Sequence, residues 1–157
     1  MSNFVITSGH FNPFHTGHLA LLKDSWKLAG ENGCVFVIVN NDKQILLKNR
    51  PILLNEDSRV EILDSMFYVD TVIKSFDTDS TVSKTLDACL QEIKKKEWSN
   101  IFFTKGGDVT SENMNQEEKR ICEKYGCTIL YGVGGQKTNS SSEIINKIRE
   151  YYTKLST

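Results

Sequence analysis

The sequence has few of the features that tie a protein to a membrane or to nucleic acid. Its 157 residues contain no apolar run of membrane-spanning length, and the N-terminal run Phe4–Ile6 is too short for a signal sequence. Lysine and arginine number 19 against 20 acidic residues, so the formal net charge is −1, without the basic excess that a nucleic-acid duplex or an anionic bilayer selects. The sequence therefore predicts no nucleic-acid partner, no membrane partner and a cytoplasmic location.

Cysteine is scarce and widely spaced. The 4 cysteines, Cys34, Cys89, Cys122 and Cys127, form no C-x-x-C pair, which argues against a zinc ribbon and against a thioredoxin-like redox site. A chain of this length, 39% hydrophobic and 25% charged, can fold on an apolar core without disulfides. We expect one domain over residues 1–157, with reduced and mostly buried thiols.

Short apolar runs alternate with segments of helical period. Strands are expected at 4–7, 34–39, 71–73, 101–103 and 128–131. Helices are expected at 16–29, at 56–67, from 80 or 81 to 96, at 116–125 and from about 140. The run 34–39 is apolar at every position, which is typical of a strand buried on both faces of a parallel sheet. This order predicts an α/β fold, a Rossmann-like doubly wound sheet of five mostly parallel strands with helices on both faces.

Polar residues and glycines follow most of the predicted strands. Ligands of doubly wound sheets bind at the carboxyl ends of the strands, so the loops at that edge are the candidates for a site. These loops are 8–18, 40–42 with 48–51, 105–108, and 134–135 with 138–142. Three of them contain glycine, which suits phosphate groups held by backbone amides.

The first of these loops holds all 3 histidines, His10, His15 and His18, within nine consecutive positions. His15 and His18 lie three residues apart where a helix begins, so both rings can project from one side of its first turn, where free amides and the helix dipole favour a phosphate. Gly17 between them lets a ligand approach the backbone closely. Two alternatives stay open: a plain surface turn, and a zinc site using all three rings, which neither a fourth ligand nor an H-E-x-x-H spacing supports.

Two motifs stand at opposite ends of the predicted five-strand chain. His15-Thr16-Gly17-His18 forms an H-x-G-H motif, preceded by Gly9 and Phe11 in the spacing Gly-x-Phe-x-x-x-His. A serine-rich turn, Ser140-Ser141-Ser142, opens the last predicted helix. Together the two motifs resemble those of the cytidylyltransferase-like nucleotidylyltransferase superfamily.

Within that superfamily, the middle of the chain most resembles the adenylyltransferase module that activates heptose 1-phosphate. The resemblance runs through Arg50-Pro51, Arg59, Val69-Asp70, Lys105–Asp108 and Ser140–Ile148, and so covers nearly the whole chain. Glycerol-3-phosphate cytidylyltransferase is the next most similar, but it lacks the lysine-glycine-glycine-aspartate form of the fourth loop.

Two residues depart from the pattern of the heptose enzymes. Asn12 replaces the usual aspartate, and Asn12-Pro13-Phe14 resembles the pyridine-nucleotide adenylyltransferases instead. His10 stands where the family has a small residue or a cysteine. These departures bear on the identity of the substrate rather than on the class of reaction.

The resemblance implies transfer of a nucleotidyl group from an NTP, with ATP favoured, to a sugar phosphate such as heptose 1-phosphate, giving an NDP-sugar and pyrophosphate. Because the attacking phosphate oxygen is already ionised, such a site supplies alignment and charge neutralisation rather than a base. Mg²⁺ is expected as the cofactor and a homodimer as the assembly. The alternatives are a cytidylyltransferase that uses CTP with a polyol phosphate, an alcohol phosphate or a phosphonate, and a nucleotide-binding module without turnover.

The resemblance also implies roles for particular residues. Catalysis is assigned to His15, His18 and Lys48, and acceptor binding to Asp42, Lys48 and Arg50. Nucleotide binding is assigned to Gly9, His10, Phe11, Gly17, Lys105, Gly106, Asp108, Ser140, Ser141 and Ser142, and no residue is expected to ligate a metal. Phe11 and Phe14 are interpreted as packing aromatics rather than base-stacking platforms. Arg59 lies inside a predicted helix and is interpreted with equal weight as a structural ion-pair partner and as a ligand-binding residue.

Overall fold

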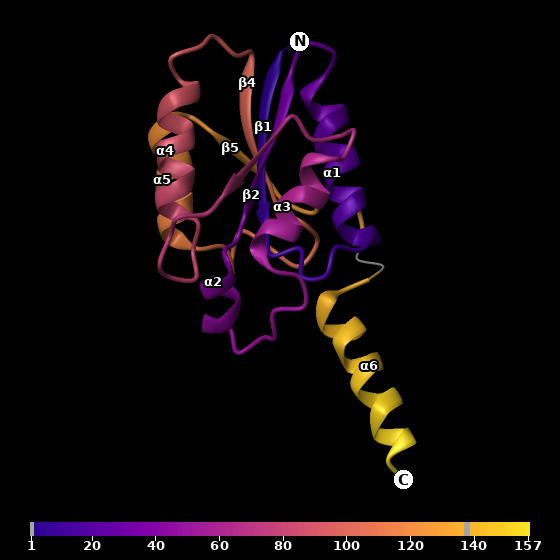
Figure 1. Ribbon diagram of the computed structural model, residues 1–157. Coiled ribbons are helices and arrows are strands. Elements are labelled where there is room, and N and C mark those ends of the chain that lie inside the picture. The colour runs from indigo at the N-terminus through magenta and orange to yellow at the C-terminus, as the bar shows by residue number, and fades with distance from the viewer. Residues whose placement is uncertain (1, 137–138) are drawn as a thin grey trace.

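Five parallel strands form the centre of the protein. The computed structural model describes residues 2–136 and 139–157, so Thr138, which the sequence places in the loop before the last helix, lies outside the described residues. The strands are β1 Asn3–Gly9, β2 Cys34–Val39, β3 Thr71–Lys74, β4 Asn100–Thr104 and β5 Thr128–Leu130. The helices are α1 Thr16–Ala29, α2 Asp42–Leu47, α3 Glu56–Asp64, α4 Ser83–Ile93, α5 Gln116–Tyr125 and α6 Ser141–Leu155. The strands pair in the order β3-β2-β1-β4-β5 (Figure 1), which confirms the predicted α/β fold.

Two apolar clusters, one on each face of the sheet, hold the helices in place. Alternate residues of a strand point to opposite faces, so Ile6 and Ile38 pack with α4 and α5, while Val5 and Val37 pack with α1 and α3. Figure 1 shows α4 and α5 on one side of the sheet and α1 and α3 on the other. The strand order reverses between β1 and β4, so the space beyond their carboxyl ends is the topological switch point of the sheet.

Helix α2 and the start of α4 differ from the prediction. α2 has only six residues, too few to show a helical period in the sequence. It is stabilised at its start by a capping box, in which the side chains of Asn41 and Gln44 each accept from the other's backbone amide. α4 begins at Ser83 rather than at 80 or 81, because the Asp77 carboxylate accepts from the amides of Lys84 and Thr85 and so fixes the first turn there.

Helix α6 begins at the edge of the sheet and points away from it (Figure 1). None of its residues is buried, and its large apolar side chains, Ile148, Tyr151, Tyr152 and Leu155, are exposed. The predicted helix is present, but unlike α1 and α3 to α5 it contributes nothing to the two apolar clusters. None of the helices in the described ranges, α6 included, combines the length and the apolar character needed to cross a bilayer.

The four thiols are free, as predicted. Cys89, Cys122 and Cys127 are buried, and Cys34 is half-buried. Burial raises the pKa of Cys89 to about 12 and, with help from the Asp70 carboxylate, that of Cys34 to about 11, so both stay protonated at neutral pH.

Candidate active site

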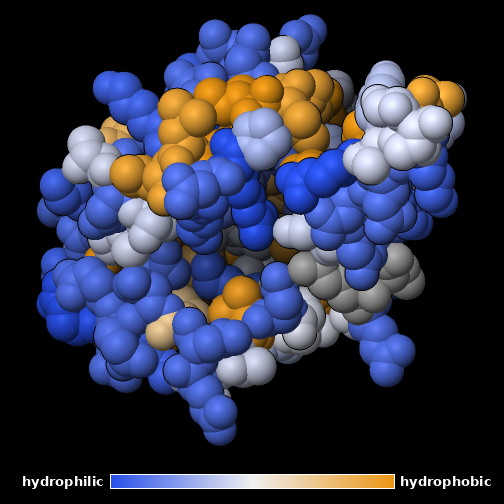
Figure 2. All heavy atoms as spheres, turned by 90° about the horizontal axis from the view of Figure 1, so that it is seen from below, coloured by the Kyte–Doolittle hydropathy of each residue, from blue (hydrophilic) through white to orange (hydrophobic). Residues whose placement is uncertain are grey.

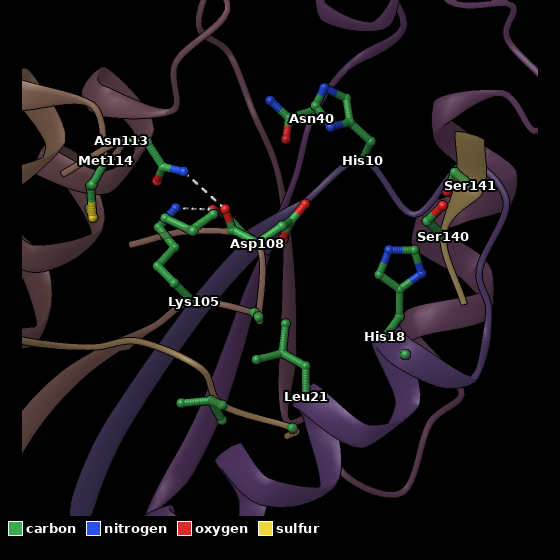
Figure 3. Close-up of a pocket in the computed structure, with 18 of the residues that line it drawn as sticks. His10, His18, Leu21, Asn40, Lys105, Asp108, Asn113, Met114, Ser140 and Ser141 are labelled. Atoms are coloured by element: carbon green, nitrogen blue, oxygen red, sulfur yellow. Dashed lines mark hydrogen bonds between the residues drawn. The ribbon is translucent and has the colours of Figure 1, made fainter. Parts of the chain in front are cut away.

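A cavity of about 460 Å³ opens at the carboxyl ends of β1 and β4, at the switch point of the sheet. Figure 2 looks onto this edge and shows the surface hollowed near its centre and surrounded largely by hydrophilic residues. Figure 3 shows the side chains that converge on the hollow from both walls. Most of the predicted site residues line it, namely Gly9, His10, His15, Gly17, His18, Lys48, Arg50, Lys105, Gly106, Asp108, Ser140, Ser141 and Ser142.

The two histidines of the H-x-G-H motif also form the N-terminal cap of α1. The Nδ1 atom of His15 accepts from the amide of Gly17 at 3.1 Å, and the Nδ1 atom of His18 accepts from the amide of His15 at 3.2 Å. The two rings stack with centroids 3.7 Å apart. A neutral imidazole that accepts at Nδ1 carries its proton on Nε2. The cap therefore fixes both rings as Nε2–H donors, and both rings lie on the cavity wall.

The N-termini of α1 and α6 meet beside these rings. The side chain of Asn139 donates to the hydroxyl of Thr16, and the Ser141 hydroxyl donates to the Pro13 carbonyl at 3.4 Å. In Figure 3 the His18 ring lies between Leu21 and the two labelled serines, Ser140 and Ser141. The positive ends of two helix dipoles, together with two imidazole donors, thus face one part of the cavity, which is an arrangement suited to phosphate oxygens.

Gly134 brings the loop before α6 against the backbone of α1. Its φ is +90°, and a Cβ there would lie 2.8 Å from the backbone nitrogen of Leu21 and 3.1 Å from the carbonyl carbon of Ala20. Only glycine allows both the backbone conformation and this close approach. Gly132 in the same loop has a φ of +65°, but a Cβ at that position would meet nothing within 4 Å among the described residues.

Substituting these two glycines separates the effect of contact from that of conformation. Gly134→Ala is expected to lower the free energy of unfolding by about 2–3 kcal/mol, because strain in φ is joined by a clash with the backbone of α1. Gly132→Ala is expected to cost only about 1 kcal/mol, the cost of the left-handed conformation alone. Urea unfolding of both variants measures the difference, and equal losses would contradict the proposed contact.

Lys105 forms the floor of the cavity together with an acidic residue that the sequence did not point to. Its Nζ lies 3.1 Å from the Ser8 hydroxyl, 3.4 Å from a Glu118 oxygen and 4.1 Å from the centre of the Phe103 ring. Burial lowers the pKa of Lys105, and the Glu118 carboxylate opposes this shift. The other Glu118 oxygen accepts from the Val82 amide at 3.0 Å, so this carboxylate joins the loop after β4 to the start of α4.

Arg59 is a structural residue rather than a ligand of the cavity. Its side chain is fully buried and donates to the carbonyls of His10, Asn40 and Leu54 and, at 2.7 Å, to the Asp42 carboxylate. Of the two interpretations of Arg59, the ion pair is confirmed. The assignment of Asp42 to the acceptor is not supported, because Asp42 is not among the residues that line the cavity and instead pairs with Arg59, which in turn donates to the His10 carbonyl in the first loop.

Phe11 and Asn12 also act beneath the cavity rather than in it. The Phe11 side chain is 1% exposed and packs in the cluster of α1 and α3, with its ring centre 4.8 Å from that of His18. The interpretation of Phe11 as a packing aromatic is confirmed, and its side chain lies off the wall where a nucleotide would bind. Asn12 accepts from the amides of Leu53 and Leu54 and donates to the Pro51 carbonyl. An ionised aspartate has no proton to donate to the Pro51 carbonyl. Asparagine at position 12 therefore holds the loop after α2 with one more hydrogen bond than aspartate could make.

His10 lies on the cavity wall beside Asn40, across from His18 (Figure 3). Burial lowers the pKa of His10 to about 4, and the positive charges of Lys48, Arg50 and Arg59 add to the shift. The imidazole is therefore uncharged at neutral pH. Lys48 and Arg50 are exposed and line the same end of the cavity, so this end offers two positive charges next to a neutral ring.

Several nucleotide-related enzymes resemble this chain in sequence. An FAD synthase from Methanocorpusculum labreanum is 35% identical over 124 residues, which cover 78% of this chain and 84% of the relative. The bifunctional protein HldE of Blochmanniella floridana is 34% identical over 147 residues, which cover 90% of this chain but only 26% of the relative. An FAD synthase from Methanopyrus kandleri is 30% identical over 83 residues, and the match spans about half of each chain, 53% of this one and 55% of the relative.

The solved structures add a likeness in fold. The lipopolysaccharide core biosynthesis protein from Thermoplasma volcanium GSS1 superimposes with a TM-score of 0.60 at 23% identity, over 83% of this chain and 94% of that one. Residues 6–148, which include both predicted motifs, match the family described as cytidylyltransferase-like. The chain therefore belongs to the cytidylyltransferase-like family of nucleotidyltransferases.

Proposed function

We propose that this protein transfers an adenylyl group from ATP to a phosphorylated small molecule, releasing pyrophosphate. The observation that carries the proposal is the histidine pair, in which both Nδ1 atoms accept from backbone amides and both rings therefore present Nε2–H donors on the cavity wall. A module that only bound nucleotide would need a phosphate cradle, but not two rings held in one tautomer.

The reaction needs charge placed where it develops in the transition state. An oxygen of the acceptor phosphate attacks the α-phosphorus, a new P–O bond forms, and the bond to the leaving pyrophosphate breaks. His15 and His18 donate from Nε2 to oxygens of the α-phosphate as negative charge builds there. The first amides and hydroxyls of α6, at Ser140 to Ser142, hold the β- and γ-phosphates at the positive end of the helix dipole.

Lys48 and Arg50 serve the incoming acceptor at the other end of the cavity. Both side chains are exposed and line the wall next to His10, so either can meet the phosphate of an acceptor. Asp108 lies in the loop after β4, where Asn113 donates to its carbonyl at 3.0 Å, and we assign it to the ribose or base of the nucleotide. Lys105 is held by Ser8 and Glu118 in the floor between the two ends.

Mg²⁺ fits this site as an ion carried by the triphosphate. Within the described residues, no group of three or more His, Cys, Asp or Glu side chains is placed to hold a metal ion. Glu118 on the cavity wall is engaged by Lys105 and by the Val82 amide. Mg²⁺ keeps several waters and binds largely through phosphates, so the triphosphate and water would supply most of its ligands here. When bound, the ion would neutralise charge on the leaving pyrophosphate.

Two acceptor classes follow from the relatives. A sugar 1-phosphate such as heptose 1-phosphate is favoured by the lysine-glycine-glycine-aspartate loop and by the HldE relative, which matches over 90% of this chain. FMN is favoured by the FAD synthase of Methanocorpusculum labreanum, where the match covers most of both proteins. The first remains our principal proposal, and CTP with a polyol phosphate is the remaining combination to test.

Pyrophosphate release tests the proposal directly. The protein is incubated with Mg²⁺ and either ATP or CTP, together with heptose 1-phosphate, FMN or glycerol 3-phosphate. We expect turnover with ATP and one of the first two acceptors, and none with NTP alone. Tight binding of ATP without pyrophosphate release across the whole panel would overturn the proposal in favour of a nucleotide-binding module, and turnover only with CTP would overturn the choice of nucleotide.

A further inference from the structure

His10 presents a buried nitrogen that the proposed mechanism does not use. It follows β1 directly, and its backbone carbonyl accepts from Arg59 at 2.8 Å, which fixes the residue from behind. Its Nε2 atom is buried and has no hydrogen-bond partner among the residues that the structure describes. The other ring nitrogen, Nδ1, is not among the buried atoms that lack a partner. The ring itself lies on the cavity wall.

The surroundings of the ring determine which nitrogen carries the proton. Placing the proton on Nε2 would bury a donor with nothing to receive it, which is more costly than burying a lone pair. The neutral ring therefore carries its proton on Nδ1, the opposite tautomer from that of His15 and His18, and directs this N–H group to the cavity.

We propose that His10 is a specificity-determining residue, which donates one hydrogen bond from Nδ1 to an uncharged oxygen of the acceptor whose phosphate is bound by Lys48 and Arg50. This inference rests on the proposed function. A hydroxyl, ether or carbonyl oxygen satisfies the donor. An ammonium group next to the phosphate does not, because it meets an N–H group and two positive side chains. The acceptor is therefore a phosphate ester whose other groups are uncharged hydroxyls or carbonyls, not the phosphate of an amino alcohol.

The tautomer can be measured without any turnover. Nitrogen-15 chemical shifts of the histidine rings separate Nδ1–H from Nε2–H and both from the charged form. We expect His10 as the Nδ1–H tautomer at pH 7, and still neutral at pH 5, while the rings of His15 and His18 show Nε2–H. An Nε2–H or doubly protonated His10 ring at pH 6 would overturn the inference and leave the proposed function standing.

Three substitutions at position 10 test the hydrogen bond itself. The amide of asparagine falls at the place of Nδ1, that of glutamine at the place of Nε2, and alanine has neither. We expect His10→Gln and His10→Ala to raise the KM for the acceptor about tenfold, the effect of one neutral hydrogen bond, and His10→Asn to stay within about threefold of the unchanged protein. The KM for ATP should not move, and melting temperatures control for folding.

Calorimetric titration with heptose 1-phosphate and with FMN measures the Kd of each acceptor for the same three variants. Equal acceptor affinity in the asparagine, glutamine and alanine variants would overturn the role of His10, even with pyrophosphate release intact. Turnover with phosphoethanolamine or phosphocholine at the rate found for the acceptors without an ammonium group would overturn it as well. Absence of both binding and turnover for every acceptor would instead show that the proposed function is wrong, and the acceptor role of His10 with it.

Discussion

His18→Asn is expected to lower the rate of pyrophosphate release about 10²–10³-fold, the typical loss for one donor aimed at a transition state. Asparagine places its side-chain oxygen where Nδ1 of His18 now accepts from the His15 amide at 3.2 Å, so the cap of α1 is kept. What the variant lacks is the Nε2–H group. The melting temperature should therefore stay close to that of the unchanged protein while turnover falls.

His18→Gln is the matched control for this prediction. Its amide nitrogen reaches the place of Nε2, while the acceptor for the His15 amide is lost. We expect partial recovery of turnover relative to asparagine, together with a lower melting temperature, because the loss of a cap costs about 1 kcal/mol. A loss of less than tenfold in His18→Asn, measured with the acceptor that the panel identifies, would rule out the catalytic role. Replacement by alanine cannot separate the two effects, because it removes cap and donor together.

Arg59→Met is expected to lower the free energy of unfolding by about 3–5 kcal/mol, because three carbonyls and the half-buried Asp42 carboxylate lose a buried charged donor. The guanidinium is fully buried, and it satisfies the carbonyls of His10, Asn40 and Leu54 as well as the Asp42 carboxylate. Methionine fills a similar volume but donates nothing. For a chain of this length the melting temperature should fall by about 10 °C.

Arg120→Met is the control for a change of charge alone. Arg120 pairs with Glu117 on the surface of α5, with 63% of its side chain exposed. Exposed pairs of this kind contribute little, so no measurable shift in the urea midpoint is expected. Arg59→Lys should be intermediate, since an ammonium keeps the charge without the five-donor geometry that serves several acceptors at once. If Arg59→Met and Arg120→Met shifted the midpoint equally, the structural role of Arg59 would be wrong.

The sequence predicts best those elements whose limits are set by local chemistry. α1 and α5 run over the predicted residues because Gly30 and Gly126 end them, and β2 is predicted to the residue because 34–39 is apolar throughout. α2 is missed because six residues do not show a period. An element is thus predicted accurately when a glycine or an unbroken apolar run marks its ends, and it is missed when it is too short for a period to repeat.

Within the site, the sequence predicts the residues that share a short motif. It misses those that reach the cavity from another helix. His15, Gly17 and His18 lie within one turn, and the structure brings them to the cavity wall together. Glu118 lies on α5, 13 residues after Lys105, and it reaches the lysine because α5 packs back against the sheet. Asp42 and Phe11 both follow strands at the carboxyl edge of the sheet, where the sequence places the site. Their side chains point away from the cavity because Asp42 pairs with Arg59 and Phe11 packs against α1.

The isolation of α6 has a thermodynamic consequence for nucleotide binding. A helix of 15 residues with none of them buried gains little from the apolar clusters, and helices of this length are marginal on their own in water. Its order rests on contacts at its first turn: the Ser140 hydroxyl accepts from the Glu143 amide at 3.1 Å, and the Ser141 hydroxyl donates to the Pro13 carbonyl. A triphosphate bound to the first turn adds a further local term, so ligand affinity and helix–coil equilibrium are linked. If the serines bind a triphosphate as proposed, any contact that stabilises the outer turns of α6 should also raise the affinity of its first turn for that ligand.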